Sequence, residues 1–494
     1  MEELYMINRD KEAAKPKGIA AAIAICIMLL GFSAQAVTVE NLNYGTFGRV
    51  TIYIPDRQPE AVVLFVSGDG GWNKGVVNMA KNIVDKDALV VGIDIRQYYK
   101  NIRRLNAKCY YPAGDFEDLS MTIQKRYKIK QYLKPILVGY SSGATLAYGA
   151  LAQAPANTFK GAISLGFCPD IETDRTLCRG IGLSSHELKR NKAFYLEPCS
   201  HLTEPFIVLQ GVDDQVCSFD DVKRYLNGMP MCELVELKKV GHGFSVEKNW
   251  VPQMLAAYSK IVHEPSYAEK KSVKSNGVQP VSATSPASYE LPLTLIPSTV
   301  KENLPLAIFI SGDGGWTSFD QTVSEMLAKR GVPVVGLDAQ SYFWSEKDPR
   351  TAAVEISKAA AHYMQQWNRK SLILVGYSFG ACVAPFIANR FPEMVKDALK
   401  EVFCISPDET GDFEIHISDM LSLSNREKYN VLAEVKKIKS LNPICLFGNE
   451  ESEELRSHFV AAGVKVQTLP GNHHFNEDYQ ALSLAIVRGL TGGN

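Results

Sequence analysis

Two serines in this chain lie in the same five-residue pattern, Gly-x-Ser-x-Gly. Ser141 lies in Val-Gly-Tyr-Ser-Ser-Gly and Ser378 in Val-Gly-Tyr-Ser-Phe-Gly. Each motif follows an apolar run that is typical of a buried strand and precedes a stretch that is typical of a helix. A serine at such a strand, turn and helix junction stands exposed above the sheet, and the flanking glycines leave room for the sharp turn. Both serines are therefore candidate nucleophiles.

Each serine is followed by an acid at the same distance. Asp214 and Glu451 both lie 73 residues after their serine, and both lie three residues past a glycine that ends an apolar run. A catalytic base needs such an acid to fix its tautomer. The preceding residues, Asp213 and Glu450, are the alternative acids.

A histidine completes each set. His242 lies in Gly-His-Gly-Phe and His473 in Asn-His-His-Phe, and both follow their acid in the chain. The order Ser, then Asp or Glu, then His is that of α/β-hydrolases. The chain therefore carries two candidate Ser-His-acid triads, and the predicted chemistry is ester hydrolysis through an acyl-enzyme.

A tetrahedral intermediate also needs backbone N–H donors aimed at its oxygen. The sequence Ser-Gly-Asp-Gly-Gly-Trp occurs twice, each time after an apolar run. One donor is expected from this loop and one from the residue after the nucleophile. The candidates are Asp69, Gly70 and Ser142 in the first copy and Asp313, Gly314 and Phe379 in the second. The two aspartates are expected either to attract a cationic substrate group or to cap the next helix.

The repeated motifs belong to a repeated plan. Apolar runs alternate with helix-like stretches before and after a segment rich in Lys, Ser, Pro and Ala. This alternation predicts an α/β fold with two tandem α/β-hydrolase-like domains, each a doubly wound, mostly parallel sheet. The expected divisions are a signal peptide (1–36), a first domain (37–264), a flexible linker (265–288) and a second domain (289–494).

The N-terminus predicts export. Two lysines precede a short apolar run, and Ala34-Gln35-Ala36 is typical of a signal peptidase site. We expect a periplasmic protein that begins at Val37. An uncleaved anchor is the alternative, although the run is shorter than the roughly 20 residues that span a bilayer.

Export also makes the cysteines informative, because an oxidising compartment permits disulfides. The first half of the mature chain holds six: Cys109, Cys168, Cys178, Cys199, Cys217 and Cys232. The sequence alone does not choose among their pairings. Cys382, Cys404 and Cys445 lie in apolar contexts in the second half and are expected to be free and buried.

Charge and motif content exclude other classes of protein. The net charge is −1, and no basic cluster is present that would bind a nucleic-acid backbone. Metal spacing such as Cys-x-x-Cys is absent from the sequence. We expect no metal, no cofactor and no nucleic-acid partner.

With Ser-Gly-Asp-Gly-Gly-Trp, Gly-Tyr-Ser-Phe-Gly-Ala and Gly-Asn-His-His-Phe together, the chain resembles the VirJ/AcvB family of exported bacterial α/β-hydrolase proteins. The resemblance covers the second domain nearly end to end, and the first domain looks like the extra N-terminal half of the longer, AcvB-type members. It implies that Ser378, Glu451 and His473 are nucleophile, acid and base. One departure is Asn472, where a second glycine would be usual.

The resemblance also implies a substrate and partners. It implies an association with virulence and the hydrolysis of aminoacylated phosphatidylglycerol, which releases lysine or alanine from the lipid headgroup. The expected contacts are therefore a lipid headgroup, a transient contact with the membrane surface and a link to a secretion system. The sequence favours the second domain as the active one and leaves the first open. The alternative function is an exported, secretion-associated binding or scaffold protein with inactive hydrolase folds.

Overall fold

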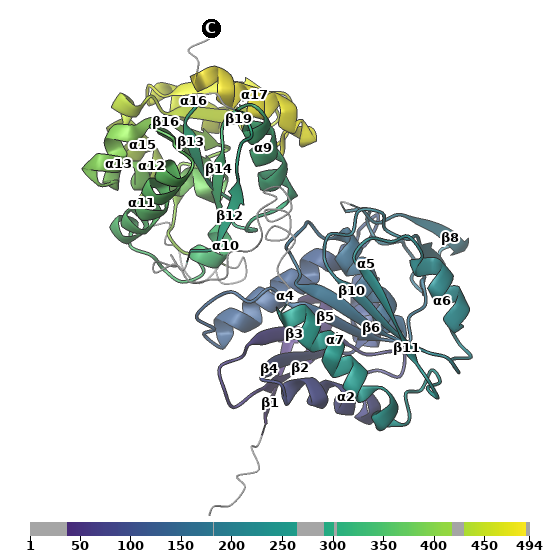
Figure 1. Cartoon of the computed structure of the whole chain (residues 1–494). Coiled ribbons are helices and arrows are strands. Elements are labelled where there is room, and N and C mark those ends of the chain that lie inside the picture. The colour runs from purple at the N-terminus through teal and green to yellow at the C-terminus, as the bar shows by residue number, and fades with distance from the viewer. Residues whose placement is uncertain (1–36, 181, 264–290, 301–303, 417–428, 491–494) are drawn as a thin grey trace, which may run out of the picture.

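The computed structural model describes residues 37–180, 182–263, 291–300, 304–416 and 429–490. Within these ranges the chain forms two lobes, each built on its own sheet (Figure 1). The expected signal peptide (1–36) and linker (265–288) lie outside the described residues, so the expected domain limits remain predictions.

The first sheet has eight strands in the order β1-β2-β4-β3-β5-β6-β10-β11. β2 pairs antiparallel with both β1 and β4, and the remaining neighbours are parallel. The strands are β1 Thr38–Tyr44, β2 Gly48–Ile54, β3 Ala61–Val66, β4 Ala88–Ile93, β5 Ile136–Tyr140, β6 Gly161–Leu165, β10 Phe206–Gly211 and β11 Cys232–Leu237. The segment between β6 and β10 forms a small antiparallel sheet. Its strands are β7 Asp170–Ile171, β9 Ala193–Leu196 and β8 Ser185–Lys189.

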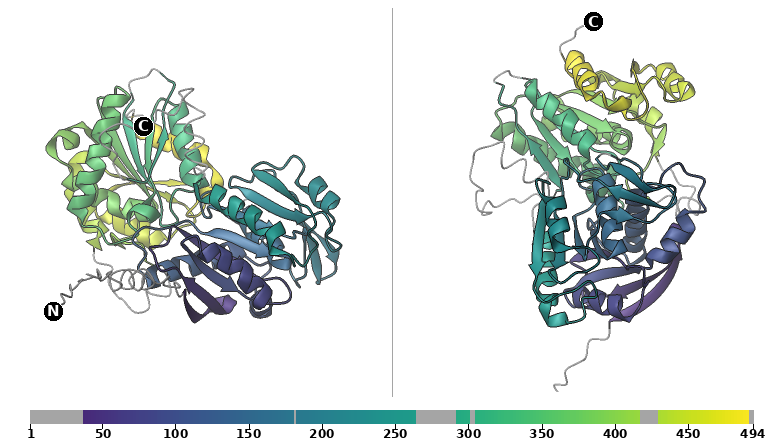
Figure 2. Two further views of the ribbon diagram at one scale, coloured as in Figure 1. Left: turned by 60° about the horizontal axis from the view of Figure 1, so that its bottom comes forward. Right: turned by 90° about the vertical axis from the view of Figure 1, so that its right-hand side faces the viewer.

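Helices cover both faces of this sheet (Figure 2). They are α2 Lys74–Val84, α3 Ile95–Ile102, α4 Pro112–Arg126, α5 Ser142–Gln153, α6 Phe219–Leu226 and α7 Val251–His263. Successive side chains of a strand point to opposite faces. Along β3, Val62 and Leu64 therefore pack with α4 and α5, whereas Val63 and Phe65 pack with α2 and α7. This two-sided burial explains why the central strands are apolar without interruption.

The second sheet repeats this plan with seven strands, β12-β14-β13-β15-β16-β19-β20, of which only the β12–β14 pair is antiparallel. The strands are β12 Leu293–Ile296, β13 Leu306–Ile310, β14 Val334–Leu337, β15 Leu372–Tyr377, β16 Leu399–Ile405, β19 Ile444–Gly448 and β20 Lys465–Leu469. Two short strands, β17 Thr410–Gly411 and β18 Tyr429–Asn430, pair outside it. The helices are α9 Ser318–Lys329, α10 Ala339–Tyr342, α11 Pro349–Gln366, α12 Phe379–Arg390, α13 Glu393–Ala398, α15 Val431–Lys437, α16 Glu453–Ala461 and α17 Tyr479–Leu490.

The two sheets confirm the expected fold class, two tandem α/β-hydrolase domains. The tryptophan of each glycine loop packs against the neighbouring strand. A Cβ on Gly336 would lie 2.0 Å from the ring of Trp316, and one on Gly92 would lie 2.0 Å from the ring of Trp72. Only glycine fits at each of these two strand positions, because any side chain would overlap the indole ring. Among the helices of the described residues, none combines the length and the apolar character needed to cross a bilayer.

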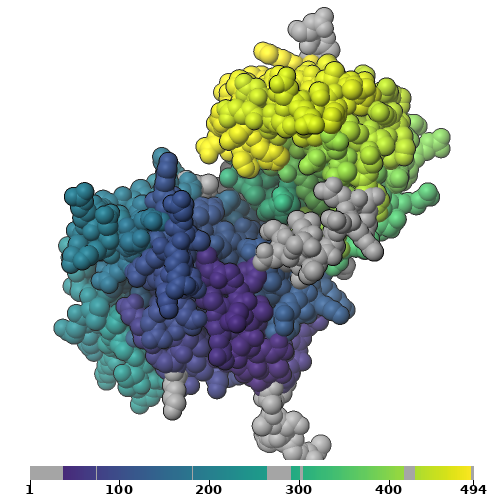
Figure 3. All heavy atoms as spheres, turned by 180° about the vertical axis from the view of Figure 1, so that it is seen from behind, coloured from purple at the N-terminus to yellow at the C-terminus, as the bar shows by residue number. Residues whose placement is uncertain are grey.

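The two domains contact each other through a small number of side chains. On the first domain the contact uses the end of α4 and the segment after it. Lys125 Nζ donates to the carbonyl of Trp344 and lies 3.0 Å from Glu414 Oε1. The Trp344 indole N–H donates in turn to the Ile129 carbonyl at 2.9 Å, and its ring lies 4.9 Å from that of Tyr132. Figure 3 shows the two lobes from behind, where they touch.

Candidate active site

Both candidate nucleophiles occupy a strained turn between a strand and a helix. Ser141 joins β5 to α5 with φ 56° and ψ −125°, and Ser378 joins β15 to α12 with φ 51° and ψ −114°. Such angles cost a non-glycine residue about 1–3 kcal/mol. A Cβ on Gly139 would lie 2.1 Å from the Gly143 carbonyl oxygen, and one on Gly143 would lie 2.4 Å from the Ser67 carbonyl oxygen. The motif glycines are therefore dictated by close backbone contacts.

In the first domain the structure brings the three predicted triad residues together. His242 Nδ1 lies 2.8 Å from Asp214 Oδ2, and His242 Nε2 lies 2.9 Å from Ser141 Oγ. A carboxylate only accepts hydrogen bonds, so Nδ1 carries the proton and Nε2 is the acceptor for the Ser141 hydroxyl. This is the arrangement in which a histidine can take the proton of a serine.

The acid of this triad is buried and fully hydrogen-bonded. Asp214 is 4 % exposed. Besides His242 it accepts the side-chain amide of Gln210 at 3.0 Å and the backbone N–H groups of Val216 at 2.9 Å and Cys217 at 3.0 Å. These donors offset the cost of burying a charge. The alternative acid, Asp213, is exposed, and Asp214 is the residue that contacts the histidine.

In the second domain the acid and the histidine are paired, but the serine is not. His473 Nδ1 lies 2.9 Å from Glu451 Oε1, and Glu451 Oε2 accepts from the Ser406 hydroxyl at 3.0 Å and the Gly448 N–H at 2.6 Å. Among the described residues no hydrogen bond joins Ser378 to His473, whose side chain is 44 % exposed compared with 18 % for His242. Catalytic hydrogen bonds of this kind often tighten only when substrate binds. The second site is thus less completely assembled than the first.

Each glycine loop lies directly beside its serine. A Cβ on Gly68 would lie 3.0 Å from Ser141 Cβ, and one on Gly312 would lie 3.6 Å from Ser378 Cβ. The next residue in each loop is Asp69 or Asp313, so its N–H is placed near the nucleophile. In the second loop the Gly314 N–H is taken by the Asp313 carboxylate at 3.2 Å. The Asp313 N–H is therefore the better oxyanion donor of the two that the sequence proposed.

The second donor of each site is the first residue of the helix after the serine. Ser142 begins α5 and Phe379 begins α12. The first N–H groups of a helix have no acceptor within it. Both groups are therefore free to bind a developing oxyanion.

The loop aspartates do not cap the following helices. Asn73 caps α2 by accepting from the Gly75 N–H, and Thr317 caps α9 in a capping box with Asp320. Asp69 and Asp313 are both exposed. The capping alternative is therefore wrong, and two carboxylates remain at the mouths of the two sites.

A comparison with protein-family models assigns the chain to a family. The model of a family described as "Bacterial virulence protein (VirJ)" matches residues 60–165 and 305–492, more than half of the 494 residues. The chain belongs to the VirJ family. The resemblance based on the motifs is thereby confirmed. The second matched range spans nearly the whole second domain, and the first ends at the last residue of β6. No curated protein matches the chain.

Solved structures that match this VirJ-family chain each cover about half of it. An esterase domain from Rhodothermus marinus is 14% identical and covers 46% of this chain and 98% of its own, with a TM-score of 0.31. Est1E from Butyrivibrio proteoclasticus is 10% identical and covers 46% and 99%, with a TM-score of 0.31. An alpha-beta serine hydrolase homologue from Coxiella burnetii is 14% identical and covers 46% and 95%, with a TM-score of 0.29.

The tyrosine before each serine is a site residue that sequence reasoning missed. Tyr140 donates its hydroxyl to the His242 carbonyl at 2.9 Å. Tyr377 lies 2.8 Å from His474 Nδ1 and donates to the His473 carbonyl at 3.4 Å. Each tyrosine thus ties the histidine loop to the serine turn. The signal was present, since both motif copies in this VirJ-family chain read Gly-Tyr-Ser.

A disulfide braces the first triad. Cys168 pairs with Cys217, and Cys109 pairs with Cys178. The Cys217 N–H donates to Asp214, so the first bridge anchors the acid loop. Cys382, Cys404 and Cys445 are all buried, and Cys404 and Cys445 are free thiols, as the sequence predicted.

Removing this bridge is expected to impair the first site alone. In a Ser378→Ala background, replacing Cys168 and Cys217 with serine should lower kcat for a p-nitrophenyl ester about tenfold, because Asp214 loses its anchored donor. Replacing Cys109 and Cys178 instead is the matched control. Each pair of changes should cost about 2–4 kcal/mol of stability, measured by denaturant unfolding. Equal kcat values for the two variants would contradict a role of the Cys168–Cys217 bridge at the site.

Proposed function

We propose that this VirJ-family protein is a serine-dependent carboxylic ester hydrolase. The observation that carries the proposal is the continuous hydrogen-bonded series from Ser141 through His242 to Asp214. A serine, a histidine and an acid linked in this order are the requirements for nucleophilic attack on an acyl carbon.

The reaction follows from the geometry. The Ser141 oxygen attacks the ester carbonyl while its proton passes to His242 Nε2. Asp214 stabilises the imidazolium, and the N–H groups of Asp69 and Ser142 bind the oxyanion. When the intermediate collapses, His242 gives the proton to the leaving alcohol and Ser141 keeps the acyl group. Water, activated by the same histidine, then releases the acid and restores the serine.

For the substrate we propose the aminoacyl ester of phosphatidylglycerol, with lysine or alanine as the acyl group. Such an ester carries a free ammonium close to the reacting carbonyl. The exposed carboxylates of Asp69 and Asp313, each next to a glycine that faces a nucleophile, would attract it. This placement supports the proposal and would disfavour the uncharged acyl chain of an ordinary lipid ester.

The first domain adds a further carboxylate near the second site. Glu117 on α4 is close enough to interact with Gln340, which packs against Gly315 of the second glycine loop. The pKa of Glu117 is raised to about 7, mainly by burial; the hydrogen bond with Gln340 opposes this shift, and the nearby Asp313 and Asp118 carboxylates add to it. A bound ammonium would favour the charged form of Glu117. We propose that the protein acts in the periplasm and contacts the membrane surface only transiently, with a link to a secretion system as a further role.

The substrate proposal is tested by the products. The protein is incubated with lysyl-phosphatidylglycerol and with unmodified phosphatidylglycerol, and free lysine and free fatty acid are measured. We expect lysine from the first lipid and no fatty acid from either. Fatty acid without lysine would make the protein a phospholipase and overturn the substrate assignment.

Asp313 of the second glycine loop is expected to contribute to substrate binding and not to the chemical step. Asp313→Asn, in a Ser141→Ala background, should raise KM for lysyl-phosphatidylglycerol up to about fivefold with kcat nearly unchanged, because an exposed ion pair contributes at most about 1 kcal/mol. Asp397→Asn, at an exposed position on α13, is the control. An unchanged KM in Asp313→Asn would remove the role of this aspartate and leave the hydrolase proposal intact.

A further inference from the structure

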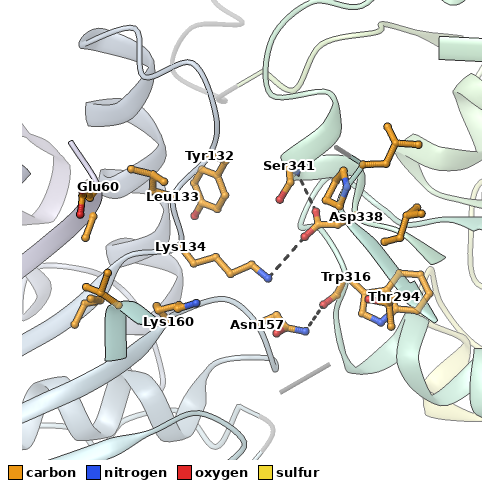
Figure 4. Close-up of a pocket in the computed structure, with 16 residues that line it drawn as sticks. Glu60, Tyr132, Leu133, Lys134, Asn157, Lys160, Thr294, Trp316, Asp338 and Ser341 are labelled. Atoms are coloured by element: carbon orange, nitrogen blue, oxygen red, sulfur yellow. Dashed lines mark hydrogen bonds and ion pairs between the residues drawn. The ribbon is translucent and has the colours of Figure 1, made fainter. Parts of the chain in front are cut away.

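The glycine loop of the second site, residues 311–316, is held partly by the first domain. The side-chain amide of Asn157, in the first domain, donates to the Trp316 carbonyl at the end of this loop at 3.0 Å. Lys134 Nζ, also in the first domain, lies 3.7 Å from Asp338 Oδ2. Figure 4 shows both contacts crossing from one domain to the other. The first domain therefore reaches the loop that carries the proposed oxyanion donor.

The Asp338 carboxylate supports this loop directly. A Cβ on Gly315 would lie 2.9 Å from Asp338 Oδ1, so the carboxylate lies against the backbone of the loop. The same oxygen accepts the Ser341 N–H at 3.0 Å, which fixes the orientation of the carboxylate. Asp338 is 7 % exposed, and burying a charge is costly unless a group of opposite charge is near. Lys134 supplies that charge from the first domain.

The first domain meets the same need with a residue of its own. Its segment Gly-Ile-Asp-Ile-Arg ends at Arg96, and 244 residues further on the segment Gly-Leu-Asp-Ala-Gln ends at Gln340. Arg96 donates to both carboxylate oxygens of Asp94, at 3.1 Å and 2.8 Å. A Cβ on Gly71 would lie 1.9 Å from Arg96 Nη2, so the guanidinium lies against the first glycine loop. Asp94 in turn accepts the Trp72 N–H of that loop at 3.2 Å.

The second domain has no arginine at this place. The neutral amide of Gln340 cannot balance the charge of Asp338, and Lys134 of the first domain does so instead. Gln340 is itself buried against α4 of the first domain, where its amide donates to the Met121 sulfur at 3.5 Å. The cation, the carboxylate and the loop thus belong to one domain at the first site, whereas the second site takes its cation from the neighbouring domain.

We propose that Lys134 and Asn157 of the first domain are positioning residues of the second catalytic site. Lys134 balances the charge of Asp338, which lies against the loop, and Asn157 holds the carbonyl of Trp316 at the end of the loop. Together they fix the loop whose Asp313 N–H binds the oxyanion. An oxyanion donor is effective only when its N–H already points at the developing charge. This inference rests on the hydrolase proposal, because it assigns a role within that reaction.

Turnover of p-nitrophenyl acetate by the second site alone tests this role. In a Ser141→Ala background, Lys134→Met should lower kcat about tenfold with KM nearly unchanged, because the loop acts on the oxyanion and not on substrate binding. Lys134→Arg keeps the positive charge and should retain most of the activity. Asn157→Gly should lower kcat about threefold, since a hydrogen bond between neutral groups contributes less than a contact with a charge. Glycine suits the φ of 70° at this position.

Two controls separate this role from a general loosening of the structure. Lys125→Met breaks another contact between the domains, the ion pair with Glu414, and should leave kcat unchanged. The second control is Lys134→Met in a Ser378→Ala background, where only the first site can act. Lys134 precedes β5 and Ser141 follows it, so the length of this strand, roughly 17 Å, separates them. The first site should therefore keep its full activity.

Hydrogen exchange reports on the loop without any turnover. The Gly315 N–H donates to the Gly312 carbonyl at 3.1 Å, so it is protected as long as the loop is held in place. We expect the peptide that contains residues 311–316 to exchange at least about threefold faster in Lys134→Met and in Asn157→Gly than in the parent. Lys125→Met should exchange as the parent does.

These two measurements distinguish a failure of this inference from a failure of the hydrolase proposal. If the Ser141→Ala parent hydrolyses the ester, an unchanged kcat in Lys134→Met would overturn the role of Lys134. Unchanged exchange in both loop variants, or an equal change in Lys125→Met, would overturn it as well. If the parent shows no esterase activity, faster exchange in the loop variants would keep their positioning role and refute hydrolysis at the second site.

Discussion

In a Ser378→Ala background, Ser141→Ala is expected to lower kcat for p-nitrophenyl acetate by about 10⁴-fold or more. Without the Ser141 oxygen no acyl-enzyme forms at the first site, and removal of a triad serine typically costs up to about 10⁶-fold in kcat. The single variants then apportion the activity between the domains. The sequence favoured the second domain, but the Ser141–His242 hydrogen bond is the one already formed, so we expect Ser141→Ala alone to remove the larger share.

Ser184→Ala, at an exposed position outside both sites, is the control for the effect of losing a hydroxyl. Full turnover in the Ser141→Ala/Ser378→Ala double variant would refute the serine hydrolase proposal. Loss of activity in Ser378→Ala alone would place the working site in the second domain.

The second large effect concerns the acid. Asp214→Asn, again in the Ser378→Ala background, is expected to reduce kcat about 10⁴-fold with little change in KM. An asparagine amide at this position donates to His242 Nδ1. The ring proton then moves to Nε2. With a proton already bound, Nε2 can no longer accept the proton of Ser141. The expected fall in kcat therefore comes from the loss of His242 as the general base, and the fold should stay intact.

Asp213→Asn is the matched control, because it makes the same chemical change one residue earlier at an exposed position. It should keep at least about half of the activity. If Asp213→Asn and Asp214→Asn were impaired equally, the contact of Asp214 with His242 would not be the basis of catalysis. Glu450→Gln and Glu451→Gln form the same pair of tests in the second domain.

The parts of the fold that the sequence predicted are those that local physics determines. Apolar runs such as Ala61–Val66 can only be central strands, since both of their faces are buried. The serine turns were equally clear because Gly139 and Gly143 have no space for a side chain. The edge strand β1 was missed because it is half exposed and carries no continuous apolar signal.

The rest depended on contacts between distant residues. The sequence permitted disulfides among six cysteines but did not place Cys217 beside Asp214. Nor could it show that Ser378 stays unbonded to His473, because a spacing in the chain does not fix the orientation of a side chain. The contact between the domains left no periodic pattern at all, since it rests on single residues such as Lys125 and Asn157.

The packing of Trp344 has a practical consequence for dissecting this protein. The indole is 2 % exposed, and part of its covering comes from the first domain, through the ring of Tyr132, the ammonium of Lys125 and the Ile129 carbonyl. A recombinant fragment that begins after the linker would present this apolar ring to water and would lose the Ile129 acceptor of its indole N–H. Such a fragment is expected to self-associate. Aggregation of the isolated second domain would therefore reflect the loss of its contact with the first domain and not a failure to fold.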